Sequence, residues 1–162
     1  MTRTIFIATL LLLAASSCTQ EPKKAERKPQ TAEELTRAII QEVRDVIQST
    51  DEQLTGRQPV SRELPATEEQ DAGASLQLWM ENDNPVRLIA ITGKGQQSNF
   101  YFANKALFFV SQNDGQFIFI GPELKYWLDE RWAIQQVTET VRKAKEAELK
   151  EAADRWLGML KG

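Results

Sequence analysis

Two stretches decide the fold: FYFANKALFFV at residues 100–110 and FIFIGPELKYW at residues 117–127. Each places apolar and aromatic residues on both sides of a short turn, Asn104-Lys105 in the first and Gly121-Pro122 in the second. The two stretches align at an offset of 17 residues, and a third, poorer copy, WMENDNPVRLI, covers residues 79–89. A strand, a tight turn and a second strand make one β-hairpin, so the sequence predicts a repeated hairpin.

The β region extends beyond these copies. Runs of apolar, β-branched and aromatic residues alternate with Asn, Asp, Gly and Pro, and they span residues 75–81, 86–92, 98–103, 107–112, 116–120 and 124–128. Connections this short join antiparallel neighbours. We therefore expect residues 75–128 to form an antiparallel β-meander of about five to six strands.

Helical patterns flank the meander. Thr31 and Glu34 have the spacing of a capping box, and apolar residues then recur at three- and four-residue steps, which predicts an amphipathic helix over residues 31–55. A long C-terminal helix is predicted within residues 129–162, from about Arg131. Residues 56–74 have no periodicity and are expected to be a mobile linker. The fold class is α+β, with residues 31–162 forming one domain.

The N-terminus carries a targeting signal. Residues 1–17 contain Arg3 and a short apolar run, which is typical of a secretory signal peptide and too short for a membrane helix. Small residues precede Cys18, so the segment resembles a bacterial lipoprotein signal, although Ala15 stands where that family usually has Leu. The resemblance implies cleavage before Cys18 and lipidation of its thiol. The alternative is that Cys18 is an ordinary residue near a signal-peptidase site.

The resemblance also implies a location. A lipid anchor on Cys18 would attach the chain to the membrane of the cell envelope, and Thr19 at the next position favours the outer membrane under the enterobacterial sorting rule. Residues 18–30 are polar, with prolines and mixed charges, and are expected to be a disordered tether. At residues 75–128, the hairpins look like the repeats of small Bacteroidetes-type lipoproteins of undefined function and, more distantly, MORN-type repeats. That resemblance implies no catalytic residues.

Composition excludes several classes of chemistry. The chain has 162 residues, one cysteine and no histidine, which removes disulfide scaffolds, Cys/His zinc sites and histidine-assisted nucleophiles. A formal net charge of -3 does not favour nucleic-acid binding. We find no catalytic or metal-binding constellation and expect neither a cofactor nor enzymatic activity; an enzyme that uses carboxylates alone ranks last among the functions we consider.

Alternation along the strands divides the apolar residues between two faces. We expect one face to lie under the helices, led by Phe100, Phe102, Leu107, Phe109, Phe117 and Phe119. The other face would carry Val110, Ile120 and the candidate partner-binding residues Tyr101, Phe108, Ile118 and Trp127. If both helices pack on the first face, the second is an exposed aromatic surface. If one helix packs on each face, both faces are core.

The exposed surface would suit a membrane-anchored binding or scaffolding lipoprotein of the cell envelope, which is the function we favour from the sequence. Its partner would be an envelope protein or a peptide. The alternative is a periplasmic inhibitor or sensor lipoprotein that binds an enzyme or a peptide on the open face of its sheet. Both functions need a surface that the domain itself leaves uncovered.

The lipoprotein hypothesis predicts the behaviour of a Cys18→Ala variant. The natural chain should begin at Cys18 after processing and partition into the detergent phase, because acyl chains hold a protein on a membrane. The variant should be soluble or unprocessed when its fractions are compared by immunoblotting. An unchanged membrane fraction for Cys18→Ala would contradict the assignment.

Overall fold

The computed structural model describes residues 31–66 and 73–161. Seven strands form one antiparallel sheet in which every strand pairs with its neighbours in the sequence. The elements follow one another as α1 (Ala32–Leu54), β1 (Val60–Leu64), β2 (Ala74–Glu81), β3 (Asn84–Thr92), β4 (Gln97–Ala103), β5 (Ala106–Gln112), β6 (Gly115–Ile120), β7 (Glu123–Leu128) and α2 (Glu139–Lys161). The expected α+β meander is confirmed, with one strand more than the sequence predicts. The signal peptide, Cys18 and the tether lie outside the described residues.

The additional strand, β1, lies in the segment that the sequence predicts as a mobile linker. It pairs antiparallel with β2, from Val60 opposite Leu78 to Leu64 opposite Ala74. The linker prediction is wrong here because β1 is an edge strand whose residues are exposed, apart from a half-buried Leu64. Such a strand has no buried face, so its sequence lacks the apolar alternation by which strands are recognised.

The three repeated hairpins share one irregularity. Asn82-Asp83 and Asn104-Lys105 both have positive φ at the two turn positions, as a type I′ turn requires, and Gly121 has φ 59° in the third turn. The register shifts next to Trp79, Tyr101 and Ile118, which leaves one extra residue on the returning strand. These extra residues are Val86, Phe108 and Lys125, each three positions after its turn. The poorer copy, which the sequence comparison begins at Trp79, therefore begins one residue earlier, at Leu78, when the turns are aligned.

These bulges correct the face assignment. After an extra residue, the following side chains lie on the face opposite to the one that simple alternation predicts. Phe109 therefore packs with Tyr101 and Ile118, not with Phe100. Val110 and Trp127 pack in the cluster that contains Phe100, not with Tyr101. The remaining members of the expected core face, Phe102, Leu107, Phe117 and Phe119, do pack together.

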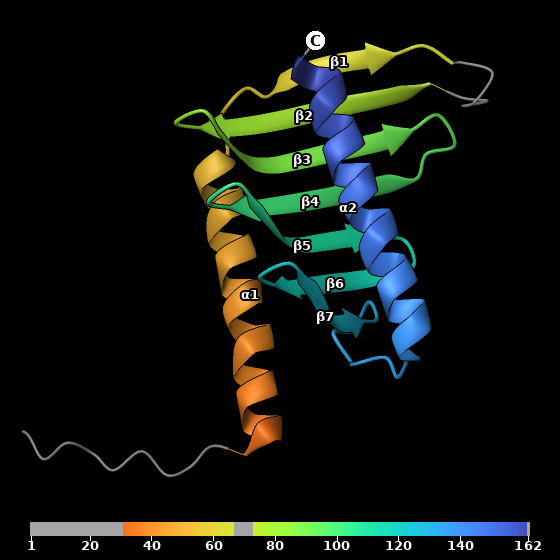
Figure 1. Ribbon diagram of the computed structural model, residues 1–162. Helices are drawn as coiled ribbons and strands as arrows, with labels where there is room; N and C mark the ends of the chain where they lie inside the picture. Colours follow the sequence, from red (N-terminus) through yellow and green to blue (C-terminus); the bar gives the residue numbers. More distant parts are fainter. Residues whose placement is uncertain (1–30, 67–72, 162) are drawn as a thin grey trace, which may run out of the picture. The chain divides into compact units, whose positions relative to one another are not determined.

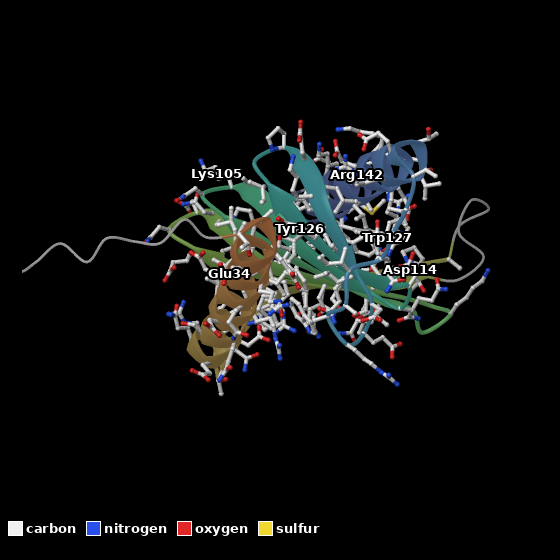
Figure 2. All side chains as sticks on the ribbon, turned by 90° about the horizontal axis from the view of Figure 1, so that it is seen from below. Glu34, Lys105, Asp114, Tyr126, Trp127 and Arg142 are labelled. Carbon is white, nitrogen blue, oxygen red and sulfur yellow. The ribbon has the colours of Figure 1, made fainter. Side chains whose placement is uncertain are left out.

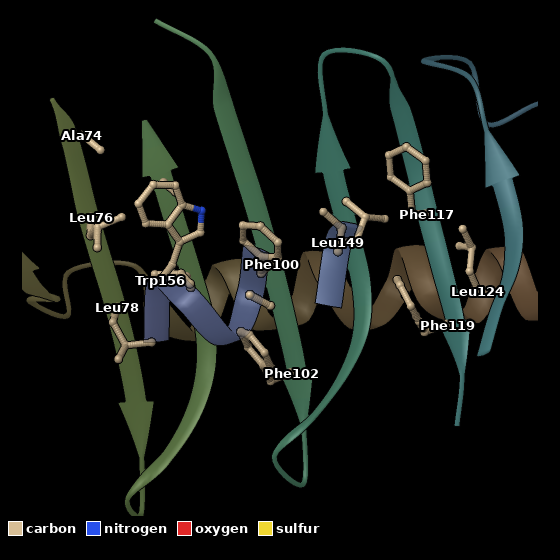
Figure 3. Close-up of a cluster of buried hydrophobic side chains, with 14 residues drawn as sticks. Ala74, Leu76, Leu78, Phe100, Phe102, Phe117, Phe119, Leu124, Leu149 and Trp156 are labelled. Carbon is tan, nitrogen blue, oxygen red and sulfur yellow. The ribbon is translucent and has the colours of Figure 1, made fainter. Parts of the chain in front are cut away.

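One helix covers each face of the sheet, as Figures 1 and 2 show. On one face, Leu149, Ala153 and Trp156 of α2 pack into the larger core cluster, whose centre is formed by residues of β2 to β7 (Figure 3). On the other face, Ile40, Val43 and Ile47 of α1 pack against the smaller cluster formed by Tyr101, Phe109, Ile118 and Leu128. The structure therefore has one helix on each face of the sheet, and not both helices on the same face.

Both helices have well-defined starting points. The Thr31 hydroxyl accepts a hydrogen bond from the Glu34 amide at 3.1 Å, and the Glu34 carboxylate accepts one from the Thr31 amide at 2.9 Å, so the predicted capping box is confirmed. The C-terminal helix, in contrast, begins at Glu139 and not near Arg131. The Asp129 carboxylate instead accepts hydrogen bonds from the amides of Arg131 and Ala133, which holds a turn.

The turn after β7 sends the chain back along that strand. Trp132 has φ 65°, a left-handed conformation that interrupts any helix at this point. Leu128 then forms a β-bridge with Ile134, and the Gln135 amide donates to the Trp127 carbonyl at 2.8 Å. Residues 129–138 therefore cover part of the outer edge of β7, which explains the late start of α2.

The two clusters predict where truncation destabilises the domain. Phe109 is 2% exposed under α1 and Phe119 is 4% exposed under α2. Replacing either by Ala should lower the free energy of unfolding by about 3 to 5 kcal/mol, because each leaves a cavity in a packed cluster. Denaturant titration measures the loss, and Ile120→Ala, at a side chain that is 45% exposed, is the matched control. Losses below about 1 kcal/mol at both phenylalanines would contradict this packing.

Candidate functional site

The candidate partner-binding residues do not form an exposed face. Tyr101 is 4% exposed and Ile118 is fully buried, both in the cluster beneath α1. Phe108 is half-buried at the border of that cluster. Trp127 is half-buried on the opposite face, where it packs with the α2 side of the core. The four residues are thus divided between two faces, and the helices cover them.

Tyr101 instead joins α1 to the sheet. Its hydroxyl donates to the Asp51 carboxylate at 3.0 Å, and Arg87 forms an ion pair with Asp51 at 3.1 Å. The Arg87 guanidinium lies over the rings of Trp79 and Tyr101, at 5.5 and 5.3 Å from their centroids. Burial raises the pKa of Tyr101 well above its usual value; the nearby Arg87 charge opposes this rise and Asp51 adds to it. The hydroxyl therefore stays protonated and holds the end of α1.

A groove opens between α2 and the sheet, and we call it the α2 groove. Its main part has a volume of about 520 Å³. The sheet contributes Ala90, Thr92, Gln96, Ser98 and Gln112, and the helix contributes Ala144, Ala147, Glu148, Glu151, Ala152, Arg155 and Trp156. A second part of about 300 Å³ shares Gln96, Ser98, Gln112 and Glu148 with the first and extends to Asn113, Asp114 and Lys145.

The groove exists because two neighbouring rows of side chains, each running across the strands on the α2 face of the sheet, differ in side-chain volume. The row Leu78, Leu88, Phe100, Val110 and Phe117 crosses the sheet with large apolar side chains that fill the space below α2. Two residues further along the strands, β3 and β4 carry Ala90 opposite Ser98, and β5 and β6 carry Gln112 opposite Gly115. Small and polar side chains at these positions leave space between the helix and the sheet.

Gly115 closes one end of this second row. A Cβ atom at Gly115 would lie 2.7 Å from the Leu128 carbonyl oxygen and 2.9 Å from Nε1 of Trp127, which is closer than atoms pack. The φ of Gly115 is also positive, at 149°. Trp127 therefore lies against the Gly115 backbone, and only glycine permits this contact. The structure thus gives Trp127 a packing role outside the lining of the α2 groove.

Several polar groups of the groove are available to a ligand. The Gln112 side-chain amide donates to the Ser98 hydroxyl at 3.0 Å, which leaves the amide oxygen of Gln112 and the hydroxyl hydrogen of Ser98 uncommitted in this pair. The Thr92 hydroxyl oxygen is buried and has no hydrogen-bond partner among the described residues. Buried polar groups of this kind normally have a partner. The Thr92 oxygen is closed off from solvent, so the accessible hydrogen-bonding groups of the floor are those of Ser98 and Gln112.

The charges at the groove are largely paired. Lys145, whose side chain is 10% exposed, forms ion pairs with Asp114 at 2.8 Å and Glu148 at 2.9 Å. Its ammonium group also lies 5.2 Å from the centroid of the Phe117 ring. Burial by itself would lower the pKa of Lys145, but hydrogen bonds to Asp114 and Glu148 outweigh it, so the pKa lies above its usual value. Lys145 is thus a neutralised structural cation.

The position of α2 over the sheet is set by a second charged cluster, near the label of Arg142 in Figure 2. The Glu146 carboxylate accepts a hydrogen bond from the Leu124 amide at 2.8 Å, and Arg142 donates to the Leu124 carbonyl at 2.6 Å. The Leu124 hydrogen bond, reinforced by Lys150 and Lys143, lowers the pKa of Glu146 to about 2. These contacts fix the helix on β7 and so maintain the groove beside it.

The sequence did not identify the α2 groove. Residues 93–97 lie between two of the expected strands, and the structure confirms a turn there, between β3 and β4. A signal was nevertheless present: Thr92, Ser98 and Gln112 are polar residues at positions whose neighbours on the same face are buried and apolar. Recognising it required the correct face for each strand, which the bulges obscured.

The described residues show neither a metal site nor a membrane-spanning helix. Within residues 31–66 and 73–161, no three Cys, Asp or Glu side chains gather in a way that could hold a metal ion. No helix in those residues is both long and apolar enough to cross a membrane.

Glu146 predicts a pH dependence of stability. Because its pKa is lowered on folding, Glu146 stabilises the domain above its usual pKa of 4.5, and this contribution is lost as the pH falls towards about 2. Glu146→Gln should therefore reduce the free energy of unfolding at neutral pH and make its decline between about pH 5 and pH 2 shallower. Urea titrations across this range measure both effects, with the exposed Glu42→Gln as control. An equally steep decline in Glu146→Gln would refute the assignment.

We compared the chain with protein-family models, curated protein sequences and solved structures, and none of them matched. The groove, its lining residues and their charges are therefore the basis on which a function is proposed.

Proposed function

We propose that this protein is a lipid-anchored binding module of the bacterial cell envelope that holds a ligand in the α2 groove without transforming it. The observation that carries this proposal is the half-buried Ser98–Gln112 pair, with its uncommitted hydroxyl hydrogen and amide oxygen, in a groove of about 520 Å³. A volume in this range is typical of small-molecule sites. Hydrogen-bonding groups that lack partners in the free protein are available to orient a ligand.

The rigidity of the groove supports binding. Its floor belongs to β3, β4 and β5, each paired on both sides, and its wall is α2. The ion pair of Lys145 with Asp114 connects this wall to the turn between β5 and β6, and Glu148 of α2 holds the Lys145 side chain in place. A site that is largely formed before binding loses less conformational entropy when the ligand enters.

The anchor belongs to the same proposal. Lipidation of Cys18 would place the domain on the envelope membrane, and Thr19 favours the outer membrane. The twelve residues from Thr19 to Gln30 could span at most about 45 Å if fully extended. In this arrangement the domain would sample ligands close to the membrane surface.

The alternative proposed from the sequence, an inhibitor or sensor that binds an enzyme or a peptide on an open sheet face, loses its surface. It needs Tyr101 and Ile118 to be exposed, and both are buried beneath α1. The groove on the other face is recessed and carries the uncommitted groups of Ser98 and Gln112, so we favour it as the binding site.

Groove binding can be tested by thermal unfolding of the full chain with the small soluble molecules extracted from envelopes. A ligand at ten times its Kd should raise the Tm of the natural chain by about 5 °C, because it binds the folded state alone. Ala147→Trp should abolish the rise, since Ala147 lines the groove. Ala38→Trp, at an exposed position of α1, is the matched control and should respond normally. A missing rise in the natural chain, or an equal rise in all three, would contradict the proposal.

A further inference from the structure

The charges of the α2 groove narrow the class of ligand. Lys145 is already paired with Asp114 and Glu148, so it is not free to bind a phosphate. The helix side adds Glu151 and a single further cation, Arg155, whose guanidinium lies 4.5 Å from the centroid of the Trp156 ring. Carboxylates that line a groove repel an anionic ligand. Across the groove, the carboxylates of Asp114, Glu148 and Glu151 nearly balance the cations of Lys145 and Arg155, so the groove is suited to an uncharged ligand.

The floor of the groove offers hydroxyl and amide groups. Ser98 contributes a hydroxyl, and Gln96 and Gln112 contribute side-chain amides. The hydroxyl can donate and accept, and each amide offers a carbonyl oxygen and an NH₂ group. A ligand rich in hydroxyl groups, which likewise donate and accept, would satisfy this mixture. An apolar ligand would leave the Ser98 hydroxyl hydrogen and the Gln112 amide oxygen without a partner.

A peptide fits the groove less well. Extended peptides are commonly bound by adding a strand to a free sheet edge, but β3, β4 and β5 are interior strands without one. Amphipathic helices need an apolar groove, and polyproline segments need exposed aromatic rings. The apolar lining here is limited to alanines and Trp156, and Trp156 is only 4% exposed. Recognition must therefore act through side chains on a compact polar molecule.

We propose that the α2 groove binds an uncharged saccharide of one or two sugar rings. This inference rests on the proposed binding function and adds the chemical class of the ligand. The Ser98 hydroxyl and the Gln112 amide oxygen bind ring hydroxyls, and the alanines of α2 allow the ring to approach the helix. The volume of about 520 Å³ lies within the range of small-molecule sites and accommodates a ligand of this size.

Trp156 provides a specific reporter for a direct test. It is the single tryptophan among four that lines the groove; Trp79, Trp127 and Trp132 lie elsewhere and serve as internal controls. The full chain, in a detergent without sugar headgroups, is titrated at millimolar concentrations with glucose, N-acetylglucosamine, cellobiose and chitobiose, with inorganic phosphate and trialanine as competing classes. The NMR signals of the four indole N–H groups are followed, and Trp156→Phe identifies the Trp156 signal. At least one saccharide should shift that signal in a saturable way.

A double variant separates recognition from a general effect on the fold. Ser98→Ala with Gln112→Ala removes the hydrogen-bonded pair of the groove and should weaken saccharide binding about tenfold. Ser49→Ala with Gln53→Ala removes a pair of the same residue types on the exposed side of α1, 3.2 Å apart, and should leave the affinity unchanged. Circular dichroism confirms that both variants are folded.

The possible results distinguish this inference from the proposed function. A Trp156 shift by a saccharide that weakens in the groove variant alone supports the inference. Shifts by phosphate or trialanine only, shifts that are equal in both variants, or no shift with any probe would overturn it. If envelope extract stabilises the natural chain but not Ala147→Trp while no saccharide shifts Trp156, the saccharide inference fails and the proposed function stands.

Discussion

The sheet carries apolar side chains on both faces, and the chain supplies one helix for each. Phe100 and Phe117 on one face, and Phe109 and Ile118 on the other, are all 2% exposed or less. An uncovered face would leave a large apolar patch in water, which isolated domains rarely tolerate. Covering both faces requires both helices, α2 on one face and α1 on the other. The candidate binding surface is consequently not an open sheet but the part of one face where the side chains are too small to fill the space beneath the helix.

Features that depend on neighbouring residues could be predicted from the sequence, whereas features that depend on the pairing between strands could not. The capping box at Thr31 and the turn at Asn104-Lys105 involve neighbouring residues, and both were predicted correctly. The bulge at Phe108 depends on the register between two strands, which alternation alone does not define. One extra residue reversed the expected faces of Phe109 and Val110. The α2 groove could not be inferred without those faces, and so it appears first in the structure.

The bulges also connect the hairpin repeat to the placement of α2. In the last hairpin the extra residue is Lys125, and the preceding residue, Leu124, is fully buried while its amide and carbonyl bind Glu146 and Arg142. Unpaired backbone groups at the edge strand β7 thus become the attachment point of the helix. The segment that returns to Ile134 covers the rest of this edge. The contacts at β7 therefore cover the edge of the sheet and also position α2, which is the wall of the groove.

The opposite edge, β1, is protected by its charges. Two copies could pair antiparallel through β1 about a twofold axis normal to the sheet. Where that axis passes through Arg62 or Glu63, the residue would lie directly opposite its own copy. Like charges opposite each other destabilise a strand pair. Arg62 also donates to the Met159 carbonyl near the end of α2, so it is held beside the edge. The lipid anchor that we propose would concentrate the domains on a surface, where an unprotected edge promotes aggregation, and charges on β1 would oppose that outcome.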